Sequence, residues 1–161
     1  LNSYGYLFNI LKRRSIDEKH VVRKAAIICI YEIIKTMKNS LLLPMIDLLT
    51  DRIRDKAVSI RQTVIRYLSS CLDIFPDNKE LIEIWLDNVL PSALDTEKTV
   101  QTEAFQSIEK YLFSQLTEGR GKNMTSMMKD NHFEVLKSVF LAFKQRGVSL
   151  SKISNKYILY L

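Results

Sequence analysis

The feature that most constrains the fold is a polar signal that recurs three times, about 40 residues apart. Asp17, Asp55 and Asp95 each precede an apolar helical pattern, and a polar residue stands six positions after each of them. The copies follow one another by 38 and then 40 positions. An internal repeat of this length indicates an array of stacked copies of one supersecondary unit.

Downstream of each aspartate, the apolar residues keep a common register. Four positions recur in every copy, and within a copy they lie four residues apart, a step that places side chains on one face of an α-helix. The three series are Val22, Ala26, Ile30 and Ile34; Ile60, Val64, Leu68 and Leu72; and Val100, Ala104, Ile108 and Leu112. A second apolar helical pattern precedes each aspartate, so each unit is predicted to be a helical hairpin.

Composition agrees with this interpretation, because 161 residues with only four Gly and three Pro leave few turns and favour long helices. Two-helix units of about 40 residues are typical of HEAT and armadillo arrays, whose units bury their apolar faces by stacking. We therefore predict an all-α fold, an α-solenoid of HEAT-type helical hairpins with about three repeats and a divergent fourth pair. The expected single domain has units at about 1–38, 39–76, 77–117 and 132–161, with a mobile insertion at 118–131.

The repeated polar residues are interpreted first as a structural ladder. Each aspartate can cap the helix that follows it, and the arginine six positions on can reach an aspartate of the adjacent unit. The predicted ladder consists of Asp17, Asp55, Asp95, Arg23 and Arg61. Gln101 interrupts it, so the second-to-third interface is expected to depend more on apolar packing. Asp77 with Glu80 predicts an acidic capping box at the start of the third unit.

Cations are concentrated around the first two of these turns. Stacking would align them in a strip that contacts duplex DNA through its phosphates, without reading bases and with a steep dependence on salt. The DNA-binding candidates are Lys12, Arg13, Arg14, Lys19, Arg23, Lys24, Arg52, Arg54, Lys56 and Arg61. A solvated face without a ligand is the alternative interpretation. Net charge is +5 over residues 1–38, +1 over 39–79, −6 over 80–118 and +6 over 119–161, so the acidic third unit is expected to receive a basic partner segment.

The sequence offers no support for an enzyme, a cofactor or a small-molecule substrate. No phosphate-binding glycine loop, nucleophile elbow or pair of catalytic carboxylates is recognisable. His20 and His132 have no metal-ligand neighbours, and Trp85 is expected in the core. Cys29 and Cys71 lie among apolar residues, which predicts burial and a reducing compartment. No apolar run reaches the length of a membrane span or signal peptide, so we expect a soluble section of a longer protein without membrane contact.

Several stretches resemble the type-D HEAT-repeat, non-SMC subunit of the condensin II complex. They are Asp17 to Ala25, Arg54 to Gln62, Trp85-Leu86 with Val89-Leu90-Pro91, Asp95-Thr96-Glu97-Lys98-Thr99-Val100-Gln101, and Leu150-Ser151-Lys152 with Asn155-Lys156. The resemblance includes a glutamine where most HEAT repeats have arginine, and it spans most of the chain outside residues 118–131.

The resemblance implies a non-catalytic scaffold of a chromosome-condensing SMC complex, whose ATPase resides in other subunits. It implies kleisin and other condensin subunits as partners, duplex DNA or nucleosomes as a sequence-independent ligand, and a place on chromosomes in the nucleus during mitotic condensation and cell division. The alternative is a HEAT-repeat adaptor without nucleic-acid binding, such as a transport receptor or a cohesin-loader-like protein.

Overall fold

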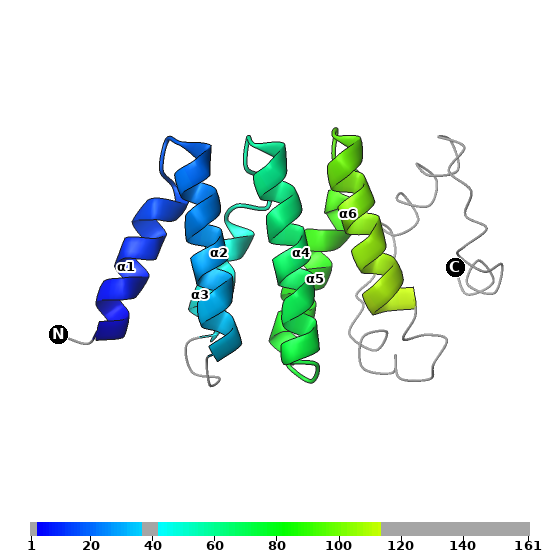
Figure 1. Ribbon diagram of the computed structural model, residues 1–161. Helices are drawn as coiled ribbons and strands as arrows, with labels where there is room; N and C mark the ends of the chain where they lie inside the picture. The colour runs from blue at the N-terminus through cyan, green and yellow to red at the C-terminus, as the bar shows by residue number, and fades with distance from the viewer. Residues whose placement is uncertain (1–2, 37–41, 114–161) are drawn as a thin grey trace. The chain divides into compact units, whose positions relative to one another are not determined.

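A computed structural model describes residues 3–36 and 42–113, and every regular element among them is helical (Figure 1). The prediction of an all-α fold is confirmed. The helices are α1 (Ser3–Ser15), α2 (His20–Thr36), α3 (Leu42–Thr50), α4 (Val58–Ile74), α5 (Lys79–Ser92) and α6 (Lys98–Ile108), and a π-helical turn, η2 (Glu109–Phe113), follows α6 directly. The expected insertion at 118–131, the fourth pair at 132–161 and His132 lie outside the described residues, and the proposed unit boundaries stay predictions.

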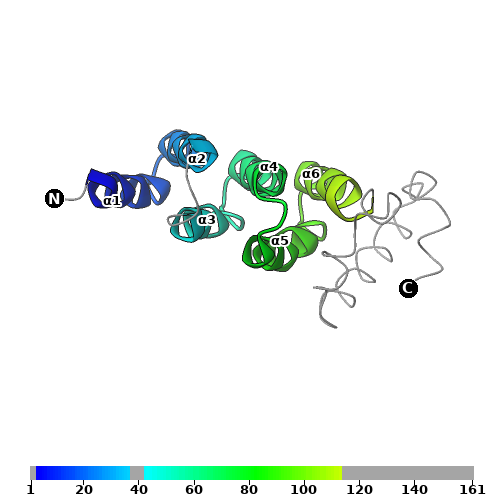
Figure 2. The same ribbon diagram turned by 90° about the horizontal axis from the view of Figure 1, so that it is seen from below.

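The chain divides after Pro76 into two compact units. In the first unit, α1 packs on α2, and α3 packs against both α2 and α4. Helices α2 and α4 lie side by side in one layer while α3 lies in a second layer, as Figure 2 shows. The first unit therefore contains two stacked hairpins, α1 with α2 and α3 with α4. In the second unit, α5 packs against α6.

The repeated apolar stripe forms the core that holds these helices. All twelve of its positions are buried except Val22, which is half-buried. Each fully buried aliphatic side chain contributes about 1.5–3 kcal/mol relative to an exposed one, so a single four-residue stripe outweighs the modest intrinsic helix propensity of its β-branched members. The prediction of the stripe is confirmed. Because α2, α4 and α6 bury equivalent positions, these helices recur along the chain at the spacing of the repeat.

The start of α5 differs from the predicted capping box. Asn78, and not Asp77, is the N-cap residue, and its side-chain oxygen accepts a hydrogen bond from the Leu81 backbone N–H at 2.9 Å. An N-cap residue has an extended backbone and directly precedes the helix, and α5 begins at Lys79. The box pattern placed this boundary one residue too early.

The two cysteines have different environments. Cys71 is buried in α4, as predicted, and burial raises the pKa of its thiol to about 12. Cys29 is exposed, so the prediction of burial was wrong for it. Its sequence neighbours Ile27 and Ile30 are fully buried, so Cys29 lies on a different face of α2 from them. Trp85, in contrast, is fully buried and meets the Tyr111 ring edge to face, with the centroids 6.2 Å apart.

Candidate functional site

The three aspartates of the repeat build the same turn three times. In each case one carboxylate oxygen accepts a hydrogen bond from the backbone N–H two residues later. The donors are Lys19 to Asp17 at 3.0 Å, Ala57 to Asp55 at 2.8 Å and Glu97 to Asp95 at 2.9 Å. Ala57 and Glu97 are themselves the N-cap residues of α4 and α6, and neither helix has a side-chain cap. The aspartates therefore shape the turn before each helix, and the prediction that they cap the helix was wrong.

The polar residue six positions after each aspartate closes this turn from the other side. The Arg23 Nη1 group donates to the Asp17 carbonyl oxygen at 2.8 Å, and the Arg61 Nη1 group donates to the Asp55 carbonyl oxygen at 2.8 Å. The Gln101 side-chain amide donates to the Asp95 carbonyl oxygen in the same way. Gln101 thus replaces arginine in the local bond, because that bond needs one N–H donor and no charge.

Arg23 has a second role, which joins the two hairpins of the first unit. Its Nε donates to Asp55 Oδ2 at 2.8 Å and its Nη2 donates to Asp55 Oδ1 at 2.7 Å, a bidentate pair between α2 and the turn before α4. The two side chains are only 4% and 3% exposed. A planar guanidinium matches both carboxylate oxygens at once, so the pair fixes the stacking register as well as the distance.

The electrostatics of this pair follow from burial and hydrogen bonding. Burial opposes ionisation of Asp55, but hydrogen bonds from Arg23 and the Ala57 N–H outweigh it and hold the pKa of Asp55 below its usual value. The hydrogen bond to Asp55 raises the pKa of Arg23 further, although burial acts against it. Both groups are therefore charged at neutral pH in a nearly dry contact between hairpins.

The direction of the pair bears on Gln101. Arg23 reaches forward to the aspartate of the following hairpin, so a missing arginine at position 101 concerns the junction beyond the third hairpin. The expectation that Gln101 alters the second-to-third interface assumed the opposite direction. The second and third hairpins belong to different compact units, so the expectation for their interface stays a prediction.

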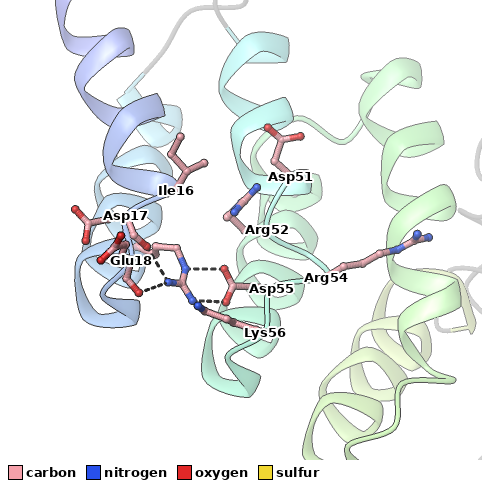
Figure 3. A pocket seen from close by; sticks show the side chains of 9 residues that line it. Ile16, Asp17, Glu18, Asp51, Arg52, Arg54, Asp55 and Lys56 are labelled. Carbon is pink, nitrogen blue, oxygen red and sulfur yellow. Dashed lines mark hydrogen bonds and ion pairs between the residues drawn. The ribbon is translucent and has the colours of Figure 1, made fainter.

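A shallow groove of about 390 Å³ lies beside the Arg23–Asp55 pair (Figure 3). Its lining carries charges of both signs: Arg23, Arg52, Arg54 and Lys56, with Asp17, Glu18, Asp51 and Asp55, and one apolar residue, Ile16. In Figure 3 the Arg54 side chain extends away from the pair. Arg52 Nε is buried and, within the described residues, has no hydrogen-bond partner. The groove is electrically balanced, so it does not attract polyanions by net charge.

The structure separates the ten DNA-binding candidates by exposure. Lys12, Arg13, Arg14, Lys19, Arg54 and Lys56 are exposed, Lys24, Arg52 and Arg61 are half-buried, and Arg23 is buried. Arg23 offers no surface to a phosphate because its guanidinium is surrounded by Asp55 and two backbone carbonyls, those of Asp17 and Glu18. Arg14 contacts Asp17 at 3.3 Å. The predicted strip is thus reduced, and carboxylates interrupt it.

An aromatic contact between the hairpins was not predicted. Tyr31 of α2 stacks on Tyr67 of α4, with the ring centroids 4.1 Å apart and the planes 6° from parallel. The repeat register pairs position 67 with position 29, and not with position 31, so comparing the repeats could not have revealed it. The signal available in the sequence was the presence of an aromatic residue late in each of two adjacent helices.

Neither a metal-binding cluster nor a membrane-spanning helix is found in the described part of the chain. Residues 3–36 and 42–113 contain no group of three or more His, Cys, Asp or Glu side chains placed to hold a metal ion. In the same ranges, no helix is both long and apolar enough to cross a bilayer.

Comparisons with known proteins give a more specific result than the fold alone. No family model matches the chain, and no solved structure matches it. Over 111 aligned residues the chain is 31% identical to the condensin-2 complex subunit D3-L of Xenopus laevis. The aligned stretch covers 69% of this chain and 7% of that protein. It is similar to the D3 subunits of condensin-2. The condensin-2 complex subunit CAP-D3 of Arabidopsis thaliana is 27% identical over 99 residues, 62% of this chain and 8% of its own length.

These matches support a relationship between the chain and the condensin-II D3 subunits, in agreement with the resemblance found in the repeats. The chain spans less than a tenth of the length of these curated relatives. What it shares with them is a short section of a much longer protein.

Proposed function

We propose that this chain is a section of a non-catalytic HEAT-repeat subunit of a condensin-II-type complex, and that it acts as a scaffold in chromosome condensation. The observation that carries the proposal is the similarity of 69% of the chain to a condensin-2 D3 subunit. The paired hairpins agree with it, because stacked helical hairpins provide extended binding surfaces and no catalytic centre is needed. The same proposal places the protein on chromosomes in the nucleus, with kleisin and other condensin subunits as partners.

The exposed cations support a further part of the proposal, namely contact with duplex DNA or nucleosomes. Lys12 and Arg13 lie in the last turn of α1, and Lys56 lies in the turn before α4. None of these three side chains makes a hydrogen bond or ion pair among the described residues, so their charges are available to phosphates. Contacts of this kind position a protein on DNA without reading sequence.

A second candidate function is a HEAT-repeat adaptor that does not bind nucleic acid. The observation that favours it is the presence of Asp17, Glu18 and Asp51 between the cations of the groove. Carboxylates repel phosphates and reduce the number of counterions that binding can release. A protein partner with charges of both signs would match such a surface better than DNA does.

Purification of the tagged full-length protein from cells in mitosis tests the first proposal directly. We expect a kleisin and SMC subunits to co-purify and to be identified by mass spectrometry. Recovery of a small GTPase or transport cargo, with no SMC subunit, would instead support the adaptor. Imaging of the tagged protein should show it on mitotic chromosomes.

DNA binding is tested separately by titration of duplex DNA at several salt concentrations. The plot of log affinity against log salt falls with a negative slope. Reversing two exposed cations, Arg13→Glu with Lys56→Glu, should make this slope less steep by about 0.9 for each lost phosphate contact. The control is Lys79→Glu with Lys98→Glu, two exposed lysines outside the strip that change the net charge equally. Equal slopes for the two variants would contradict the assignment of Arg13 and Lys56 to a DNA-binding strip. Absence of DNA binding at low salt would favour the adaptor.

A further inference from the structure

One face of the first hairpin is uncovered where the same face of the second hairpin is covered. On α4, Thr63 is buried and Tyr67 is packed against Tyr31 of the preceding hairpin. The residues one repeat earlier on α2 are Ala25 and Cys29, and both are exposed. Val21 lies on the same helical face, four residues before Ala25, and is 65% exposed.

The first helix of the hairpin shows the same difference. Leu7 and Ile10 of α1 are 39% and 38% exposed, whereas Met45 and Leu48, the equivalent residues of α3, are both 3% exposed. The first hairpin thus exposes apolar side chains at positions that are buried between hairpins in the second. No described helix packs against them. Such a patch marks a binding surface more often than a solvated one.

Asp17 adds a polar observation that is independent of this apolar face. It builds the same turn as Asp55, and its carbonyl oxygen likewise accepts a bond from the residue six positions on. Asp55 also receives a bidentate arginine from the preceding hairpin. Among the described residues, the Asp17 carboxylate receives no such arginine, and its only side-chain partner is the exposed Arg14 at 3.3 Å.

We propose that Leu7, Ile10, Val21, Ala25 and Cys29, together with Asp17, form the docking face for one more hairpin of the same kind. Because the chain spans only 7% and 8% of the two similar condensin-2 subunits, we assign this hairpin to the part of the full-length polypeptide on the N-terminal side of residue 1. Its second helix presents an arginine to Asp17 and a large apolar or aromatic side chain to Cys29, as Arg23 and Tyr31 of α2 do for Asp55 and Tyr67. The inference rests on the proposed function only in taking the chain as part of a longer array.

Alkylation of Cys29 by iodoacetamide, followed by mass spectrometry, tests the inference because this thiol lies within the face. We expect Cys29 to react in the 161-residue chain nearly as fast as in unfolded protein. In the full-length polypeptide, purified without other subunits, we expect the reaction to be at least about tenfold slower. Cys71 is the internal control for an intact fold, and it should stay unreactive in both proteins because it is buried.

Two variants of the full-length polypeptide make the test specific. Val21→Asp should restore fast alkylation of Cys29 while Cys71 stays protected. Ile16→Asp is the matched control, since Ile16 is an exposed apolar residue at 62% but lines the groove and not the docking face. In that control the protection of Cys29 should be unchanged.

Three results would overturn the inference. Equally fast alkylation of Cys29 in the chain and in the full-length polypeptide would mean that nothing covers the face. Protection that appears only after other subunits are added would assign the face to a partner protein. Slow alkylation of the isolated chain that becomes fast on dilution would assign it to a second copy. Each result is independent of whether SMC subunits co-purify, so the proposed function can fail or succeed separately.

Discussion

Replacing Asp55 with alanine should destabilise the first unit far more than replacing any exposed charge. The substitution removes both carboxylate acceptors of the Arg23 guanidinium, whose side chain is 4% exposed, and leaves it only the Asp17 and Glu18 carbonyl oxygens. It also removes the acceptor of the Ala57 N–H. Removing one partner of a buried ion pair costs about 3–5 kcal/mol, because the remaining charge stays buried without a partner. Domains of this size are stable by about 5–15 kcal/mol in total, so Asp55→Ala should remove a large fraction of the free energy of unfolding.

Urea unfolding followed by circular dichroism measures this loss, and two further variants show where it originates. Arg14→Met removes an exposed contact, since the Arg14 side chain is 63% exposed, and should cost about 0–1 kcal/mol. The double variant Arg23→Met with Asp55→Leu removes both charges together. It should be less destabilised than the sum of its single variants by about 0.5–3 kcal/mol, since neither charge is left unpaired.

A loss for Asp55→Ala no larger than that for Arg14→Met would refute this reasoning. It would mean that water reaches the guanidinium and replaces the lost carboxylate. Strict additivity in the double variant would refute it as well, because the two side chains would then not depend on each other. In either case the Arg23–Asp55 pair could not be what fixes the register of the two hairpins.

Four other substitutions test three separate contacts. Because the pKa of Asp55 is held below its ordinary value of 3.8, its stabilising effect is present above that value and lost as pH falls through the lowered pKa. The urea midpoint should therefore fall more in the wild type than in Asp55→Asn between about pH 5 and about pH 3. Asn78→Ala should cost about 0.5–2 kcal/mol in urea unfolding as the lost cap of α5, whereas Asp77→Ala should cost less than about 0.5 kcal/mol. Tyr67→Leu should lower the thermal midpoint through the loss of a ring stack that contributes about 0.5–1.5 kcal/mol, and an unchanged midpoint would contradict that contribution.

The sequence predicted those parts of the fold that depend on periodicity. Burial of a stripe such as Ile60, Val64, Leu68 and Leu72 requires only that apolar residues recur at the helical period, and this pattern is visible in any single chain. The three aspartates were found for a related reason, because their spacing from the stripe is constant. Helix positions and the repeated turn were therefore predictable before any tertiary contact was known.

Features that depend on a particular neighbour were not predictable in this way. Cys29 and Cys71 have similarly apolar sequence surroundings, yet only Cys71 is buried. Arg23 was predicted both as a ladder residue and as a DNA contact, and the two roles are incompatible because the ladder role buries the guanidinium. Sequence patterns report which side chains can face the core, whereas exposure depends on which elements are stacked beside them.

The repeated turn separates two requirements that a sequence motif combines. Closing the turn needs one donor six positions after the aspartate, and Arg23, Arg61 and Gln101 all meet this requirement. Linking one hairpin to the next needs further donors in a fixed planar arrangement, which arginine has and glutamine does not. A glutamine in this position therefore keeps the turn closed. Its uncharged amide cannot form the bidentate ion pair that Arg23 forms with Asp55.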